Sequence, residues 1–352
     1  MTDKLVLSGK IGLNNRGNTC FMNTTIQCLS HVIPLTDYIM TNRFMGPLSQ
    51  ESKKAEIPTK LLKEFEVTKG YVQLIKMIWT SSEKEALDPK SFHMAFQRFH
   101  DRFEGYHQQD AEEALTVIMD SLHETLSYPV DITISGTDES ELDRLMLDSY
   151  KKWKEMNEKR YSVIRDIFTG QFVSQIISKE GEDKNQVLSR TYENFDRINL
   201  PITGNSLYDC LYHYFNVELL EDKYHDEKGD RKIKAGKQMK IMMLPKYLIV
   251  VLKRFQNDGM RLVKKNTMVS FPIDDMDLSN YVMGYDRYSA MYKLRSIGCH
   301  IGSMNGGHYY AICRHRNEKW YSLNDRSVEE YNMKSEIPIL QQRAYMLIYE
   351  KI

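Results

Sequence analysis

The sequence contains no long apolar run, no surplus of one charge and no paired set of cysteines. Its most apolar stretch, residues 247–252, ends at Lys253 and Arg254, far short of the roughly 20 residues that a membrane-spanning helix needs. The 48 basic and 48 acidic residues cancel, so no overall field attracts nucleic acid or an anionic membrane. Residues 1–10 lack the apolar core of a secretory signal. We therefore expect neither a membrane protein nor a secreted one, and no nucleic-acid partner.

The cysteines are few, odd in number and widely spaced: Cys20, Cys28, Cys210, Cys299 and Cys313. Such a set forms no disulfide framework and suits a reducing compartment, the cytoplasm or the nucleus, in which a reactive cysteine stays a free thiol. The 352 residues are 41% hydrophobic and 27% charged, which is typical of a globular chain with one large or two ordinary domains.

Two kinds of secondary structure follow one another along the chain. Up to about residue 130, apolar residues recur at helical spacing, as over 71–79 and 92–103. After about Ile164, segments such as 247–255 and 292–300 are rich in β-branched and aromatic residues. Helices followed by strands predict an α+β protein with a groove between its two halves.

A basic stretch, residues 228–240, contains six lysines and arginines against one acid. No aromatic side chains are interleaved with them for stacking on bases. We therefore interpret the stretch as a solvated hairpin tip rather than a nucleic-acid site.

The first chemical signal is Cys20, which follows a polar, glycine-containing turn and begins a predicted helix. Asn18 or Thr19 is placed to cap that helix. The free N–H groups and dipole of a helix start favour thiolate over thiol, so Cys20 is a candidate nucleophile. Asn15, five residues upstream, can direct its amide N–H toward the sulfur and stabilise an oxyanion. This stretch alone leaves a buried structural cysteine open as the alternative, and we interpret Cys28 in that way.

The second signal is His308, which leaves the glycine-rich loop 302–307 directly into a strand. If segments 308–314 and 320–324 form a hairpin centred on Arg316, His308 lies directly opposite Asn324. A histidine that acts as a base needs such a partner to hold its ring. A loop one residue longer would place Asp325 there, so we predict Asn324 as the orienting residue and Asp325 as a helper. Cys, His and Asn in this order are typical of papain-like proteases.

Three stretches resemble the sequence boxes of the ubiquitin-specific proteases. The cysteine box is matched by GLNNRGNTCFMNTTIQCLSH and the Gln-Gln-Asp box by GYHQQDAEEALTVIMDSLHE. The histidine box is matched by CHIGSMNGGHYYAICR together with KWYSLND. Weaker matches between and after them, including SVIRDIFTGQFVSQI, LPKYLIVVLKRF and AYMLIYE, extend the resemblance from about residue 11 to residue 349.

The resemblance implies a papain-like cysteine protease fold built as a right hand. Residues 1–352 would form a single catalytic domain, with a helical thumb over about 11–130, β fingers within about 165–255 and a β-sheet palm in the remainder. By motif position Cys20 is the nucleophile, His308 the general base, Asn324 the orienting residue and Asn15 the oxyanion donor. These assignments agree with the interpretation of the residues themselves.

The implied activity is hydrolysis of the bond after the C-terminal glycine of ubiquitin through a thioester intermediate. Residues at the matching positions are expected to bind the ubiquitin tail: Asp110, Glu113, Gln109, Gly306, Gly307 and Tyr309. Asp110 can instead cap its own helix, and both roles can coexist. A protease for another ubiquitin-like modifier, or a ubiquitin-binding scaffold without turnover, stays open as an alternative. An activating or targeting protein partner also stays open.

The fingers depart from the family pattern where many members bind structural zinc. Ser178 and Gly181 stand in place of the first cysteine pair, and residues 224–228 contain no cysteine. Because all four soft ligands are missing, we expect no metal site and no cofactor. Strand pairing and packing must then hold the fingers together.

Overall fold

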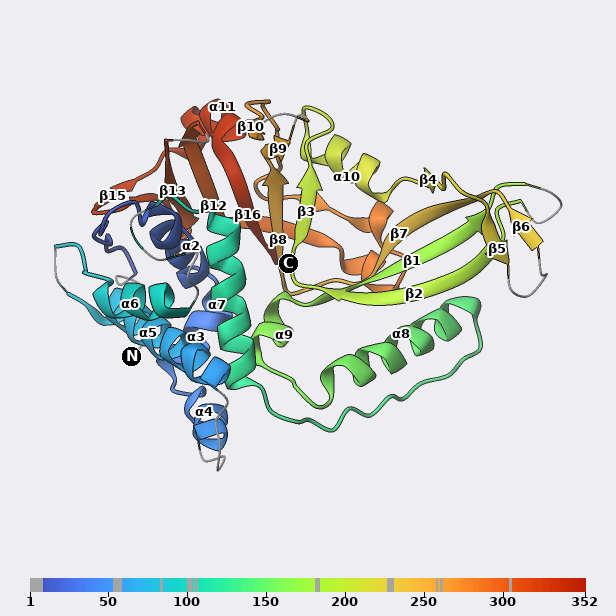
Figure 1. Cartoon of the computed structure of the whole chain (residues 1–352), viewed down its shortest axis with the longest axis horizontal. Coiled ribbons are helices and arrows are strands. Elements are labelled where there is room, and N and C mark those ends of the chain that lie inside the picture. The colour runs from blue at the N-terminus through green and yellow to red at the C-terminus, as the bar shows by residue number, and fades with distance from the viewer. Residues whose placement is uncertain are drawn as a thin grey trace.

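The structure is a computed structural model that describes residues 9–52, 59–82, 85–99, 103, 105, 107–180, 184–226, 231–257, 259, 262–303 and 306–352. Helices dominate its first third and strands the rest, so the predicted α+β class is confirmed. Figure 1 shows the helices on the left, a long narrow sheet on the right and a broad sheet between them. We call these parts the thumb, the fingers and the palm.

The thumb contains six helices among the described residues: α2 (Cys20–Ser30), α3 (Ile33–Met40), α4 (Met45–Ser52), α5 (Thr59–Thr80), α6 (Lys90–Phe99) and α7 (Ala111–Leu126). Of the helix predicted over 92–103, the structure has α6 up to Phe99, and residues 100–102 lie outside the described residues. The aromatic spacing still continues: Phe103 packs on Phe96 with ring centroids 4.5 Å apart.

The palm is an eight-stranded sheet with the order β15-β14-β13-β12-β16-β8-β3, and β11 pairs with β12 beside this path. Its strands are β3 (Ile198–Pro201), β8 (Tyr247–Lys253), β11 (Met276–Asp277), β12 (Met291–Gly302), β13 (Gly307–Arg314), β14 (Trp320–Asn324), β15 (Ser327–Glu330) and β16 (Ala344–Lys351). Helices α10 (Leu207–Phe215) and α11 (Met333–Arg343) accompany them, with the 3-10 turns η2 (Ser279–Tyr281) and η3 (Tyr285–Ser289). A short hairpin of β9 (Phe255–Asn257) and β10 (Leu262–Lys264) extends from β8.

The fingers are a four-stranded sheet with the order β2-β1-β7-β4 and a separate two-stranded hairpin, β5-β6. The strands are β1 (Gly170–Ser178), β2 (Val187–Phe195), β4 (Glu218–Leu219), β5 (Tyr224–Asp226), β6 (Arg231–Ile233) and β7 (Ala235–Met243). Of the basic stretch 228–240, the described residues 231–240 lie mostly in strands β6 and β7 and not in a hairpin tip as predicted, and Lys232, Lys234 and Lys237 are exposed.

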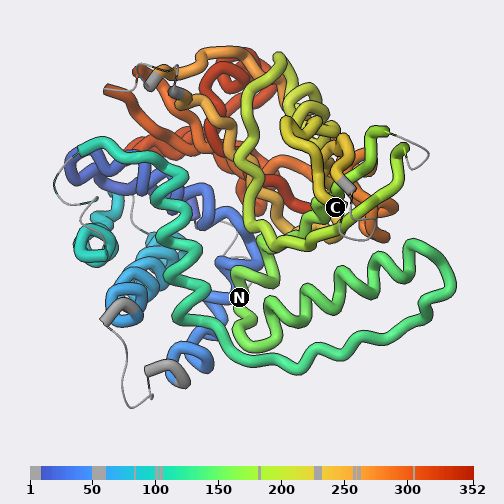
Figure 2. Tube along the Cα trace, turned by 45° about the vertical axis from the view of Figure 1, so that its right-hand side comes forward, coloured from blue at the N-terminus to red at the C-terminus, as the bar shows by residue number. Residues whose placement is uncertain are grey.

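Helix α8 (Glu141–Asn157) runs along the fingers, and α9 (Val163–Phe168) joins it to β1. In Figure 2 the chain leaves the thumb, returns as α8 and then enters the sheet. Met146 of α8 packs on Val173, Tyr192 and Met242 of the fingers, so this helix contributes to their core. A capping box at Ser140 and Asp143 fixes where α8 begins.

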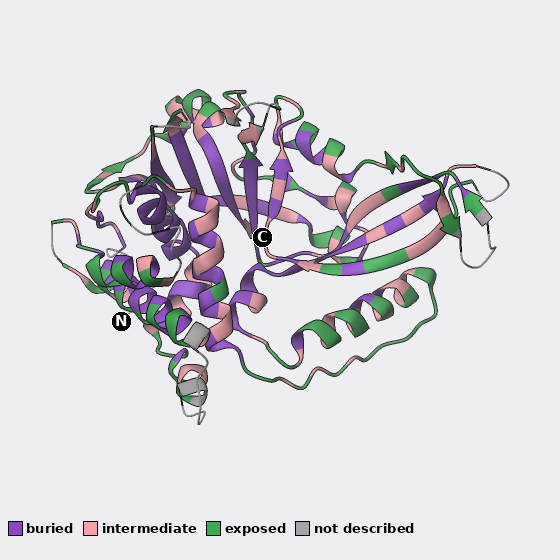
Figure 3. Cartoon of the chain, in the orientation of Figure 1, coloured by how far each residue is buried: buried purple, intermediate pink, exposed green. Residues whose placement is uncertain are grey.

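The palm sheet has a core on each face, which is why its central strands are nearly uniformly apolar. Ile249 and Val251 of β8 join the core under the thumb helices, whereas Leu248 and Val250 join the core on the opposite face. This alternation is the period of two that a strand imposes. Figure 3 shows these central strands buried along most of their length. The sheet therefore offers a rigid support to side chains at its ends.

Candidate active site

Cys20 is the first residue of α2 and lies where the thumb meets the palm. Its side chain is 4% exposed, and α2 packs against β13, the strand that carries His308. The side chain of Asn15 holds the turn before Cys20, because its Oδ1 accepts hydrogen bonds from the N–H groups of Gly17 at 3.0 Å and Thr19 at 3.1 Å. The turn needs left-handed backbone at Gly17 and Asn18, whose φ angles are 99° and 53°.

The predicted cap of α2 by the side chain of Thr19 is wrong. Thr19 occupies the N-cap position, but its side chain makes no cap hydrogen bond to the helix. The Thr19 hydroxyl instead accepts a hydrogen bond from the N–H of Arg16 at 3.0 Å and donates one to Oδ1 of Asn15 at 3.3 Å. The Thr19 side chain thus closes the preceding turn and does not accept a hydrogen bond from the first N–H groups of α2.

His308 contacts both of its predicted partners. Its Nε2 lies 2.6 Å from Oδ1 of Asn324, and the ring forms a hydrogen bond with the thiol of Cys20. The hydrogen bond to Cys20 is the largest cause that raises the pKa of His308, to about 9, and Asn324 adds to it against the effect of burial. Because Nε2 is engaged with Asn324, Nδ1 is the nitrogen left for Cys20.

The predicted register of the hairpin that carries His308 is wrong by two residues. The structure pairs Ala311 with Leu323 and Arg314 with Trp320, so Asn324 does not lie directly opposite His308. A shift of two keeps both side chains on the same face of the sheet, since strand side chains alternate with a period of two. The contact is therefore made diagonally, at a distance that these two side chains span.

Asp325 follows Asn324 at a φ of 47° and turns its carboxylate toward the thumb. One carboxylate oxygen accepts a hydrogen bond from Nδ2 of Asn15 at 2.9 Å, and the other accepts one from Nδ2 of Asn23 at 2.8 Å. It adds only a more distant negative charge to His308. The hydrogen bonds of Asp325 thus orient the residues around Cys20 and not Asn324, which specifies the helper role that the sequence left open.

This junction depends on a close approach of two backbones. A Cβ at Gly12 would lie 2.4 Å from the carbonyl oxygen of Arg326, so no larger residue fits there without a shift. Beside it, the N–H of Leu13 donates to the carbonyl oxygen of Asp325 at 2.8 Å. The turn that precedes Cys20 is in this way fixed to the end of β14.

A groove of about 260 Å³ opens beside Cys20 and contains four of the predicted tail-binding residues: Gln109, Asp110, Glu113 and Tyr309. Asp110 is the N-cap of α7, accepting the N–H of Glu112 at 2.7 Å, and it also accepts the hydroxyl of Tyr345 at 2.5 Å. Burial is the main reason that the pKa of Asp110 is raised. The capping alternative for Asp110 is therefore present together with its place in the groove.

The other two predicted residues, Gly306 and Gly307, belong to the active-site loop, which we define as residues 302–307. Met304 and Asn305 of this loop lie outside the described residues. Gln108, which the sequence reasoning missed, bonds to Gly307 twice: its Nε2 donates to the carbonyl oxygen at 2.6 Å and its Oε1 accepts the N–H at 2.9 Å. Its place as the first glutamine of the Gln-Gln-Asp box was the signal that could have revealed it.

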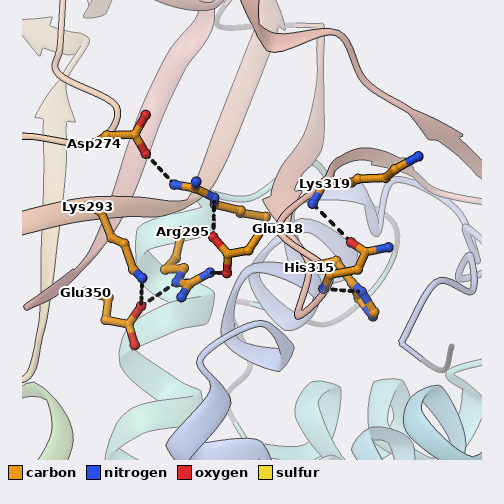
Figure 4. A network of polar contacts seen from close by, with 9 residues as sticks. Asp274, Lys293, Arg295, His315, Glu318, Lys319 and Glu350 are labelled. Carbon is orange, nitrogen blue, oxygen red and sulfur yellow. Dashed lines mark hydrogen bonds and ion pairs between the residues drawn. The ribbon is translucent and has the colours of Figure 1, made fainter. Parts of the chain in front are cut away.

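A charged network anchors the opposite end of the hairpin that carries His308 and Asn324 (Figure 4). Glu318, in the turn between β13 and β14, accepts a hydrogen bond from Arg295 at 2.9 Å and forms an ion pair with Arg314 at 3.0 Å. Arg295 also bonds to Glu350 of β16, and its side chain is 8% exposed. The network ties the hairpin turn to β12 and β16, so the strands beneath His308 are held at both ends.

Among the described residues, no cluster of three or more metal-binding side chains is found, and no helix is long and apolar enough to cross a membrane. Ser178, which the resemblance matches to the first cysteine pair of the fingers, is buried and donates to the carbonyl oxygen of Glu180 at 3.0 Å. Gly181 and residues 227–228 of the predicted substitutions lie outside the described residues. The five cysteines are all free.

A cysteine, a histidine and an asparagine meet at this site, a combination that is typical of papain-like proteases. The family model described as ubiquitin carboxyl-terminal hydrolase matches residues 11–349, and the chain belongs to this family. It is 33% identical to bovine ubiquitin carboxyl-terminal hydrolase 2 over 97% of its own length and 55% of that protein. It is 29% identical to bovine ubiquitin carboxyl-terminal hydrolase 21 over 98% of its length and 62% of that protein. The chain thus spans little more than half of these curated relatives.

Solved structures share the fold. The Ubp8 chain of the SAGA DUB module bound to monoubiquitin aligns with a TM-score of 0.76 at 22% identity, over 99% of this chain and 70% of that chain. The same module bound to ubiquitin aldehyde gives a TM-score of 0.76 at 23% identity, with the same coverage. At this identity the likeness concerns the fold, and it agrees with the right-hand architecture that the resemblance implied.

Proposed function

We propose that this chain is a cysteine-type deubiquitinating enzyme that hydrolyses the peptide or isopeptide bond after the C-terminal glycine of ubiquitin. The observation that carries the proposal is that His308 bonds to both Cys20 and Asn324 beside an acidic groove, in a chain of this family. The ubiquitin tail is basic and ends in two glycines, which suits a narrow groove that contains Asp110 and Glu113.

In the proposed mechanism, His308 takes the proton of Cys20 and the thiolate attacks the carbonyl carbon of the terminal glycine. Because the pKa of His308 is raised to about 9, the ring keeps this proton at neutral pH. The amide nitrogen of Asn15 has two hydrogens; Asp325 accepts one, and the other is available to the oxyanion. The uncapped N–H groups at the start of α2 add to that stabilisation.

Collapse of the tetrahedral intermediate breaks the carbon–nitrogen bond, and His308 gives its proton to the departing amine. The product at this stage is a thioester between Cys20 and ubiquitin. Water then attacks the thioester carbonyl while His308 accepts a proton from it. The carbon–sulfur bond breaks, the proton returns to sulfur, and ubiquitin leaves with a free carboxylate.

We further propose that residues 1–352 act as one catalytic domain in a reducing compartment, the cytoplasm or the nucleus. Support comes from strand β16, which pairs with both β12 and β8, and from the bond between Leu13 and Asp325, which together join the two ends of the matched region. Five free cysteines suit such a compartment. A separate protein partner for activation or targeting is supported by the Ubp8 structures, which contain Sgf11, Sus1 and Sgf73.

Two alternatives make different predictions in one assay. Purified protein is incubated with ubiquitin bearing a fluorogenic C-terminal amide and with matching substrates built on other ubiquitin-like modifiers. We expect turnover of the ubiquitin substrate, its loss in Cys20→Ala, and its retention in Cys28→Ala, a buried cysteine on the same helix. Turnover of another modifier in preference to ubiquitin would overturn the assignment of ubiquitin as the substrate. Binding of ubiquitin without any turnover would favour a scaffold.

A further inference from the structure

Strand β12 loses one of its two neighbours just before the active-site loop. Its pairing with β16 ends at Cys299 opposite Ala344, whereas its pairing with β13 continues to Gly302 opposite Gly307. The last residues of β12, from His300 to Gly302, therefore have a partner strand on one side alone among the described residues. The backbone groups on the open side need another partner.

Lys264 supplies that partner. Its ammonium donates to the carbonyl oxygen of His300 at 3.1 Å and to that of Gly302 at 3.1 Å. Carbonyl groups two residues apart on a strand point to the same side, so one ammonium reaches both. In Figure 1, β9 and β10 lie beside α11 at the upper edge of the palm, and Lys264 ends β10.

Lys264 is itself held in place by a buried arginine. Arg254 is fully buried, and its guanidinium donates to the carbonyl oxygens of Lys265 at 3.1 Å and Thr267 at 2.9 Å, directly after Lys264. The N–H of Lys265 returns a bond to the carbonyl oxygen of Arg254 at 2.7 Å. The backbone that carries Lys264 is thus fixed independently of the active-site loop.

The surroundings of the Lys264 ammonium disfavour its positive charge. Among the described residues, no carboxylate lies in salt-bridge range of Lys264. Burial first, and then the charges of Arg254 and Arg343, lower its pKa to about 8. A cation in such surroundings is retained for the hydrogen bonds it makes and not for a charge pair.

The segment that Lys264 contacts leads into the groove. Gly302 has a φ of 92°, and a Cβ there would lie 2.5 Å from the carbonyl oxygen of Gly306, so the active-site loop closes tightly on its first residue. Within it, the N–H of Ser303 donates to that same oxygen at 3.0 Å, and Ser303 lines the groove beside Cys20. Gln108 holds the loop at its other end, through Gly307.

We infer that Lys264 is a positioning residue that fixes the start of the active-site loop and so shapes the groove for the substrate tail. The identity of this substrate, the ubiquitin tail, rests on the proposed function. His308 is positioned separately, by Asn324 and by the pairing of β13 with β14. Loss of Lys264 therefore makes the groove more mobile than the His308 ring. Removing the Lys264 ammonium should therefore raise KM and change kcat much less.

The test compares Lys264→Met, which keeps an unbranched chain without the donors, with Lys264→Arg, which keeps donors for both carbonyls. Lys265→Met is the matched control, because the Lys265 ammonium donates to Ile202 at 3.3 Å. We expect Lys264→Met to raise KM for the ubiquitin amide about tenfold with kcat within about threefold. Lys264→Arg should return KM close to the wild-type value, and Lys265→Met should have the KM and kcat of the wild type.

Hydrogen exchange of residues 300–308 gives a readout that does not require turnover. Lys264→Met accelerates exchange there, while Lys264→Arg and Lys265→Met leave it near the wild-type rate. Unchanged exchange and KM in Lys264→Met would overturn the inference. So would a fall in kcat and Tm without a change in KM, which indicates a general structural role. If the wild type released no ubiquitin, the proposed function would fail, and the exchange result would still decide whether Lys264 holds the loop.

Discussion

The side chain of Asn15 donates to Asp325 at 2.9 Å and thereby joins the turn before Cys20 to the residue after Asn324. The same carboxylate accepts Asn23 of α2, one turn beyond Cys20. Asp325 therefore orients groups on both sides of the proposed nucleophile. In the proposed mechanism, its main contribution is to hold the oxyanion donor, while Asn324 holds the base.

Asp325→Ala should lower kcat about 10- to 100-fold while ubiquitin binding is kept, because Asn15 loses its acceptor and no longer presents its second N–H in a fixed direction. Steady-state kinetics and binding to immobilised ubiquitin measure the two effects separately. The control is Asp274→Ala, which removes a carboxylate that bonds to Arg314 in the charged network of Figure 4. Equal kcat values for Asp325→Ala and the wild type would exclude this role.

The pKa of His308 depends on its partners, so changing them should shift its titration. Cys20→Ala removes the largest cause of the raised value, and the pKa should fall from about 9 toward 6.5. Asn324→Ala should lower it by a smaller amount. Titration of the His308 ring by NMR gives these values directly. A pKa that is the same in Cys20→Ala and the wild type would show that the two residues do not interact.

The same shift predicts how stability changes with pH. A histidine pKa raised on folding stabilises the protein fully below the unfolded value near 6.5, and this contribution is lost as pH rises through about 9. Wild type should therefore be more stable than Cys20→Ala at about pH 6, with the difference shrinking above about pH 9. Urea unfolding at both pH values tests the sign; a difference that grows with pH would contradict it.

Arg295→Met should destabilise the palm, because it leaves Glu350 and Glu318 without their shared arginine. We expect a loss of about 2 kcal/mol in the free energy of unfolding, moderated by Lys293, which lies 3.7 Å from Glu350. Denaturant unfolding measures it. Lys152→Met, which breaks an exposed pair with Glu155, is the control and should cause no measurable loss. Equal stability of the two variants would show that the network contributes little.

Removal of divalent metal should leave the protein intact. Hydrogen bonds hold the fingers near Ser178: the N–H of Ser178 donates to the carbonyl oxygen of Gln186 at 2.9 Å, and the N–H of Lys234 donates to the carboxylate of Glu180 at 2.8 Å. Dialysis against a strong chelator should therefore change neither Tm nor turnover. A fall in Tm that zinc restores would reveal a metal site.

Much of the fold follows from local patterns in the sequence, and the contacts between distant segments do not. Helical and strand periodicity identified α5, β8 and β12, because each buries apolar side chains. The hairpin register was missed by two residues, since its turn geometry is set by contacts that local pattern does not reveal. The shared face of His308 and Asn324 was still predicted correctly, because an even shift preserves it.

The site residues divide in the same way. Cys20, His308 and Asn324 have chemistry that is recognisable from residue type and order. Gln108 and Lys264 act on backbone groups 199 and 38 residues away, with side chains that are ordinary anywhere on a surface. From the sequence, no partners were predicted for Asp325 as a helper. Only the folded backbone brings Asn15 and Asn23 to it.

Covalent capture tests the central claim most directly. The purified protein is mixed with ubiquitin that carries a C-terminal electrophile, alongside probes built on other ubiquitin-like modifiers, and intact mass is measured. The account predicts one added ubiquitin on wild type, attached at Cys20, and none on Cys20→Ala. Attachment at another cysteine, labelling by a different modifier alone, or no labelling despite ubiquitin binding would contradict it.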